Sequence, residues 1–125
     1  MHKDDLKDRT KRFALRIIAL VDALPNNSKG KVMGDQLLRS GTSVAANYRA
    51  ACRSKSKLEF IAKLGQVEEE ADESAFWMEM IIDSSLMKKA LVEKLLNEVY
   101  EILSIIVSSK KTAQNNSTEY QKKRI

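Results

Sequence analysis

The chain has 125 residues, one cysteine and a formal net charge of +5, so it is long enough to bury a core and cannot form an intramolecular disulfide. Its single proline and four glycines provide few turns, and helix-favouring residues dominate, which argues against a strand-rich fold and predicts an all-helical protein. No apolar run approaches the roughly 18 residues of a membrane span, and the acidic start MHKDDLKDRTKRF lacks the apolar segment of a secretory signal, so we expect a cytoplasmic protein with no membrane partner.

The first helix is predicted over residues 4–24, with aspartates near its start and Pro25 closing it. Mostly apolar side chains recur at alternating spacings of four and three, which is the pattern of one buried helix face: Leu6, Thr10, Phe13, Ile17, Leu20 and Leu24. Three arginines, Arg9, Arg12 and Arg16, share another face. That basic face is either solvated beside local aspartates or a contact surface for an anion.

A second helix is predicted over residues 31–52, with Asn27 or Ser28 as the candidate cap. The run of poor helix formers from Ser40 to Ser43, with Gly41 inside it, indicates either a kink or a close approach by another helix. We expect close approach, because the buried pattern continues in phase through Ser40, Val44 and Asn47.

Asn47 would then place an amide on a largely apolar face, which is tolerable only if the amide is hydrogen-bonded. A structural role that specifies helix register is more plausible than ligand binding, and we assign it to Asn47 together with Ser43, one turn earlier.

A basic corner from Cys52 to Lys57 leads into a third helix, predicted over residues 57–83, with Ser54 or Ser56 as its cap and Glu59 completing a capping motif. Phe76, Trp77 and Met80 add more apolar surface near its end than one buried face needs, so they belong either to the core or to a subunit interface.

The acidic run 68–73 invites comparison with metal sites in helical bundles, but those sites need histidines beside the glutamates, and the only histidine is His2. We therefore expect no metal and no cofactor.

The fourth helix is predicted over residues 89–109, with its buried face at Val92, Leu95, Val99, Ile102 and Ile106. Short connectors between four helices predict an antiparallel up-down-up-down bundle over residues 1–111. Apolar periodicity is then lost, so residues 112–125 are predicted to be a disordered basic tail.

Several features resemble the four-helix-bundle proteins encoded by intervening sequences of bacterial 23S ribosomal RNA genes, over about residues 6–111: Ser43, Ala45, Ala46 and Asn47, the basic turn 53–57, Glu59 and Phe60, then Ala71, Ser74 and Glu79. That family often follows the Asn with a hydrophobic residue and Glu-Gly, whereas here Tyr48 and Arg49 precede Ala50 and Ala51, which suggests a distinct branch.

The family is similar to the accessory proteins of diversity-generating retroelements, which form pentameric barrels, bind nucleic acid and associate with a reverse transcriptase. The resemblance therefore implies a ring-shaped homopentamer, with RNA or DNA and a reverse transcriptase or another protein as partners.

Charge is strongly segregated along the chain: residues 1–63 carry a net +8, residues 64–108 a net −7 and residues 109–125 a net +4. The first functional hypothesis is a non-catalytic bundle that binds nucleic acid, RNA above all, through phosphate contacts. Its candidate contacts are Arg9, Arg12, Arg16, Arg49, Arg53, Lys55 and Lys57.

The alternative hypothesis is a self-assembling protein scaffold in which basic and acidic faces pair between subunits, with Phe76, Trp77 and Met80 at the interface. An enzyme is not expected. There is no glycine-rich phosphate loop, and no base can be identified beside Cys52, which is better explained as a small buried residue.

Overall fold

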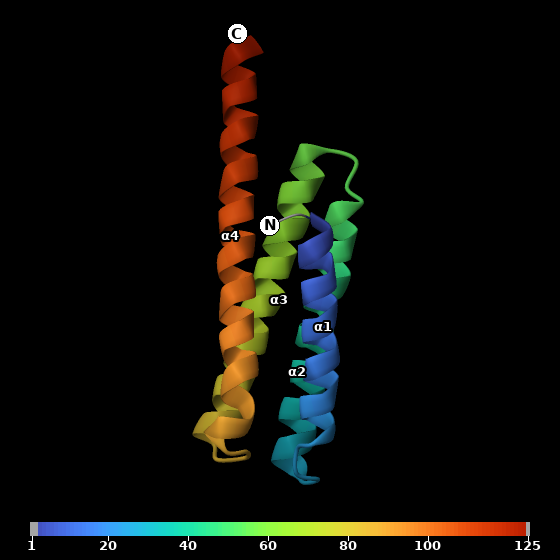
Figure 1. The fold of residues 1–125 in the computed structure, drawn as a ribbon, viewed down its shortest axis with the longest axis vertical. Coiled ribbons are helices and arrows are strands. Elements are labelled where there is room, and N and C mark those ends of the chain that lie inside the picture. Colours follow the sequence, from blue (N-terminus) through green and yellow to red (C-terminus); the bar gives the residue numbers. More distant parts are fainter. Residues whose placement is uncertain (1–2, 125) are drawn as a thin grey trace.

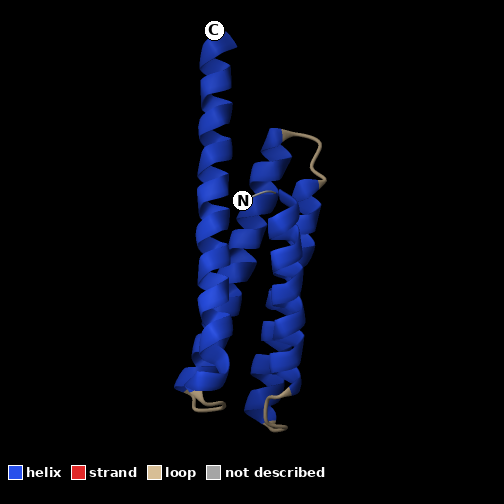
Figure 2. Cartoon of the chain, viewed as in Figure 1, coloured by secondary structure: helices blue, strands red, loops and turns tan. Residues whose placement is uncertain are grey.

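The computed structural model describes the backbone of residues 3–124 and the side chains of residues 5–116. Four helices follow one another within it: α1 (Lys3–Asp22), α2 (Ser28–Cys52), α3 (Lys57–Asp83) and α4 (Lys89–Arg124). Each helix packs against the next along the chain, and α1 also contacts α4 (Figure 1). This arrangement confirms the predicted all-helical four-helix bundle, and every connector is short (Figure 2).

Side-chain caps explain where α2 and α3 begin. The Asn27 carboxamide oxygen accepts the backbone N–H of Gly30 at 2.8 Å, and the Ser56 hydroxyl accepts the N–H of Glu59 at 3.1 Å. The Glu59 carboxylate in turn accepts the N–H of Lys55 at 3.1 Å. The structure thus selects one of the two predicted caps at each site, Asn27 for α2 and Ser56 for α3.

The end of α3 uses a residue in an unusual conformation. Ser85 has φ 59°, in the left-handed region that normally favours glycine. Its N–H donates to the carbonyl of Ile82 at 3.0 Å, and the next N–H, of Leu86, donates to the carbonyl of Ile81 at 3.1 Å. This double hydrogen bond is a Schellman motif, which turns the chain back toward α4.

Glycine allows α1 and α2 to approach closely, as the sequence predicted for the run around Gly41. A Cβ on Gly41 would lie 2.8 Å from two side-chain carbons of Ile17, and a Cβ on Gly34 would lie 3.2 Å from Leu24. The helix continues through this region without a break, because it runs from Ser28 to Cys52.

All four helices contribute to the core, and its largest fully buried side chains include Phe13, Ile17, Leu37, Leu64, Met78, Ile81, Ile102 and Ile106. Within the described side chains, three polar residues are also buried: Thr10, Ser40 and Ser74. None of the helices within residues 3–124 has a stretch long and apolar enough to cross a membrane.

The largest difference from the sequence prediction is the length of α4. Helix was predicted to end at residue 109, with a disordered tail from 112, whereas the structure continues α4 as helix through Arg124. No glycine or proline, the two residue types least compatible with a helix interior, occurs between residues 89 and 124. α4 therefore extends well beyond the other three helices (Figure 1).

Candidate nucleic-acid interface

Two cations of α1, one of α2 and the residue that caps the C-terminal end of α2 line a groove of about 450 Å³ between these helices. They are Lys7 and Lys11 on α1, and Arg49 and Arg53 at the end of α2, and all four are exposed. We call this surface the basic groove. In the part of the chain with described side chains, none of the four cations takes part in an ion pair.

The sequence places these cations in pairs. Lys7 and Lys11 are four residues apart on one helix, and so are Arg49 and Arg53, so each pair projects from the same side of its helix. Small residues of α2, namely Thr42, Ala45 and Ala46, line the groove between the pairs. The negative end of the α2 dipole also favours cations at Arg49 and Arg53.

Among the described side chains, Asp8 is the one carboxylate that lines the basic groove. Its charge offsets part of the attraction that the four cations exert on an anion. The groove nevertheless keeps a clear positive excess.

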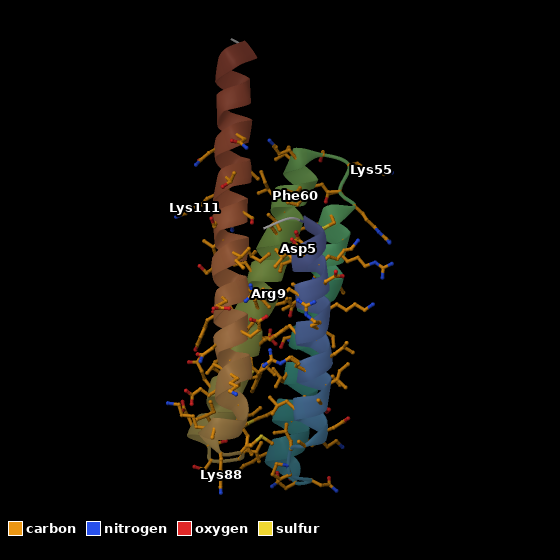
Figure 3. The ribbon with its side chains drawn as sticks, viewed as in Figure 1. Asp5, Arg9, Lys55, Phe60, Lys88 and Lys111 are labelled. Atoms are coloured by element: carbon orange, nitrogen blue, oxygen red, sulfur yellow. The ribbon has the colours of Figure 1, made fainter. Side chains whose placement is uncertain are left out.

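Arg9 does not belong to this groove, although it was predicted to contact nucleic acid. Its guanidinium is held by α4: Nε and Nη2 donate to the two oxygens of Glu98 at 2.8 and 2.7 Å, and Nη2 also reaches Glu101 at 2.5 Å (Figure 3). These hydrogen bonds lower the pKa of Glu98, against the opposing effect of its burial, and raise the pKa of Arg9. Arg9 therefore ties α1 to α4 through these three hydrogen bonds, and its charge is compensated by two glutamates.

Arg12 and Arg16 are exposed on α1, and their charges also lower the pKa of Glu98. They lie toward the acidic side of the molecule and do not line the basic groove. The three arginines of the predicted basic face of α1 thus differ in role. Arg9 forms ion pairs with α4, whereas Arg12 and Arg16 remain exposed near Glu98.

Lys55 and Lys57 line a different cleft, of about 740 Å³, between the α2–α3 corner and α4. Hydroxyls from both sides surround it, among them Ser54, Ser56, Ser108, Ser109 and Thr112. Lys55 lies on the loop that connects α2 and α3 (Figure 3). The seven predicted contacts therefore fall into three places: the arginines near Glu98, Arg49 and Arg53 in the basic groove, and Lys55 and Lys57 beside the cleft. The predicted contacts did not include Lys7 and Lys11, which also line the groove.

Ser43 and Asn47, predicted to specify register, are half-buried, and neither side chain is hydrogen-bonded to another described residue. Among the described side chains Asn47 thus has no hydrogen-bond partner, its amide stays partly in contact with solvent, and its role in specifying register stays a prediction. The buried polar contact between helices is made instead by Ser40 and Ser74, whose hydroxyl oxygens lie 3.0 Å apart.

The acidic segment of α3 is partly neutralised within the molecule. Arg39 of α2 pairs with Glu73 and with Glu70, the latter at 3.3 Å, and Lys110 pairs with Glu68 at 2.9 Å. No group of three or more potential metal ligands comes together among the residues with described side chains.

A second exposed surface combines acidic and aromatic side chains, and we call it the aromatic face. Phe76 is 49% exposed on α3, at helical spacing from Asp72 and Glu79, and Tyr100 of α4 is 43% exposed. Burial raises the pKa of Tyr100, and the nearby carboxylates of Glu79 and Asp72 raise it further, which places its phenol beside them.

Trp77 and Met80, the other predicted interface residues, are half-buried. The ring of Trp77 meets Phe76 edge to face, with centroids 5.0 Å apart, and its Nε1 donates to Glu73 at 3.2 Å. Trp77 therefore supports Phe76 from the core side, and Phe76 is the more exposed of the two.

Comparison with known proteins places this bundle in a family. No curated protein matches the chain. A crystal structure of a protein of unknown function from the S23 ribosomal protein family of Bacteroides thetaiotaomicron is 37% identical, has a TM-score of 0.82, and covers 89% of this chain and 99% of its own. The family model for the 23S rRNA-intervening sequence protein matches residues 3–108. The chain therefore belongs to the 23S rRNA-intervening sequence protein family.

Proposed function

We propose that this protein is a non-catalytic RNA-binding helical bundle that holds phosphates in the basic groove. The observation that carries the proposal is the convergence of Lys7, Lys11, Arg49 and Arg53, all exposed and none in an ion pair within the described side chains. Elsewhere, Arg9 and Arg39 are held by glutamates, so their charges are already compensated.

Phosphate contacts of this kind need no particular base sequence. Each cation that neutralises a phosphate releases a counterion, so the binding constant falls steeply as salt rises. Four contacts would give a slope of log K against log salt concentration of up to about −3.6 for a duplex.

The test measures fluorescence anisotropy of a labelled mixed-sequence RNA at about 50 mM and about 200 mM salt. The variant Arg49→Gln/Arg53→Gln removes half of the groove cations. The matched control Lys88→Gln/Lys89→Gln removes the same charge at the opposite end of the bundle, where Lys88 lies (Figure 3).

We expect the groove variant to weaken binding at least about tenfold at low salt and to reduce the salt slope by about 2, whereas the control changes little. Equal affinity of the two variants would show that binding does not use the groove. The absence of any RNA binding by the wild-type protein would overturn the proposed function.

A second candidate function is self-assembly, and the aromatic face favours it. The aromatic face combines exposed rings from α3 and α4 with carboxylates of α3, and the basic groove on α1 and α2 carries the opposite charge. A head-to-tail contact between copies requires two such different but complementary surfaces. Repetition of such a contact would close a ring, and the family resemblance implies five subunits in it. In that case Phe76 would be the central anchor.

Size exclusion with light scattering tests this second function. Wild-type protein is expected to elute as an oligomer, and Phe76→Ser is expected to shift it to the monomer with unchanged helical circular dichroism. The two functions compete for the same groove if its cations are covered on assembly. An oligomer that does not bind RNA at low salt would favour the scaffold function over RNA binding. A monomeric wild-type protein would rule out self-assembly as the function.

A further inference from the structure

The surface between the groove cations is small and aliphatic. Thr42, Ala45 and Ala46 supply it, and none of the aromatic side chains within residues 5–116 lines the basic groove. The most exposed aromatic rings among the described side chains, Phe76 and Tyr100, belong to the aromatic face on α3 and α4. The groove therefore offers a nucleic acid charges and a hydroxyl, without a ring on which a base could stack.

This composition matters because single-stranded and double-stranded ligands need different surfaces. Proteins that bind single strands combine a positive groove with aromatic rings on which successive bases stack. Double-stranded RNA keeps its bases stacked and paired internally, and proteins recognise it by shape through phosphates and 2′-hydroxyls. A duplex thus loses nothing in a groove without aromatic rings, whereas the bases of a single strand gain no partner there.

The spacing of the cations also suits contact with the phosphates along one strand of a duplex. Four residues along a helix correspond to a rise of about 6 Å, so each helix presents two cations about one turn apart. Rows from α1 and α2 flank the groove on both sides. A duplex presents its phosphates already ordered, so it gives up less conformational freedom on binding than a flexible strand.

We infer that the basic groove binds the phosphate backbone of double-stranded RNA in preference to single-stranded RNA. The inference rests on the proposed function, and it names the class of RNA that the groove accepts. Lys7, Lys11, Arg49 and Arg53 provide the phosphate contacts. The Thr42 hydroxyl between them donates to the Leu38 carbonyl at 2.7 Å, so toward RNA it can only accept, as from a 2′-hydroxyl.

The experiment compares a mixed-sequence RNA duplex of about 16 base pairs with an unstructured single strand that has the same number of phosphates. Anisotropy is measured at low salt with the wild-type protein, with Arg49→Gln/Arg53→Gln and with the Lys88→Gln/Lys89→Gln control. We expect the duplex to bind at least about tenfold more tightly than the single strand, and the groove variant to lose that binding while the control keeps it.

The possible failures can be told apart. If the single strand binds the wild-type protein as tightly as the duplex, and the groove variant loses both kinds of binding, the inference is overturned but the proposed function stands. A duplex preference that survives in the groove variant also overturns the inference, because another surface would then be responsible. Failure of both RNAs to bind the wild-type protein overturns the proposed function itself.

Discussion

The hydroxyl oxygens of Ser40 on α2 and Ser74 on α3 lie 3.0 Å apart, and both residues are fully buried. Each hydroxyl also lies near a carbonyl of its own helix, Ser74 at 2.8 Å from Glu70 and Ser40 at 3.4 Å from Leu37. The pair therefore links two helices without leaving a polar atom unsatisfied. It requires small side chains at both positions, because only these let the two helix backbones come close enough.

Replacement of either serine by alanine is expected to reduce the free energy of unfolding by about 1 kcal/mol, the usual net value of one hydrogen bond. Because the two hydroxyls contact each other, the effects of Ser40→Ala and Ser74→Ala should not add, and the double mutant should show a coupling of about 0.5 kcal/mol or more. Urea unfolding of the four proteins measures this coupling. Strict additivity would mean that the contact contributes nothing.

Gly41→Ala is expected to destabilise the protein by about 1 to 3 kcal/mol, because the new methyl group would lie 2.8 Å from Ile17 in a closely packed contact. Gly65→Ala is the matched control: nothing lies within 4 Å of its added Cβ, so the gain in helix propensity should stabilise the protein by about 0.5 to 1 kcal/mol. In an Ile17→Ala background the penalty at Gly41 should fall sharply. Thermal unfolding that ranks both glycine variants alike would contradict the close approach of α1 and α2.

Arg9→Met is expected to reduce the free energy of unfolding by about 1 to 2 kcal/mol at neutral pH, because it removes the charged donor to Glu98 and keeps an unbranched stem. The folded protein lowers the pKa of Glu98 from its ordinary value of 4.5. Its contribution to stability is therefore complete above pH 4.5 and disappears as the pH falls through the lower folded value.

The stability difference between wild type and Arg9→Met should accordingly shrink in acid, as measured by urea unfolding across that pH range. Arg12→Met is the control, because this exposed arginine donates to no described residue and should change stability by less than about 0.5 kcal/mol. A difference that stays constant with pH would show that Arg9 stabilises the fold through packing alone.

Asp8→Asn is expected to increase RNA affinity about two- to fivefold at low salt, because it removes a carboxylate that lines the basic groove beside the four cations. The increase should become smaller as salt screens the charges. Asp22→Asn makes the same charge change at the far end of α1 and should have a weaker effect. If both variants gain affinity equally, RNA affinity depends only on the net charge of the protein and not on the basic groove.

Local signals made much of the fold predictable. Ser56 and Glu59 form a recognisable start, and α3 has the predicted bounds, Lys57–Asp83. Gly41 within an unbroken apolar pattern correctly predicted a close approach, because a pattern that stays in phase is incompatible with a true break. The predicted end of the fourth helix at residue 109 was wrong, because loss of the apolar period does not by itself end a helix and the segment contains neither glycine nor proline.

The candidate site was less predictable, because it depends on which helix faces meet. Nothing near Arg9 in the sequence reveals Glu98, which lies on another helix and reaches it only when α1 packs against α4. The spacing of Lys7 and Lys11 repeats that of Arg49 and Arg53, and this similarity was the available signal. The sequence does not show that the two pairs face one another, since this depends on the rotation of α1 against α2.

The separation of the basic groove on α1 and α2 from the acidic residues of the aromatic face on α3 and α4 gives the bundle a permanent electric dipole. The electric field of an approaching polyanion exerts a torque on this dipole before any contact is made. The bundle therefore turns its basic groove toward the polyanion as the two molecules meet. Charge changes on α3, remote from the groove, should therefore alter the rate of association more than the rate of dissociation.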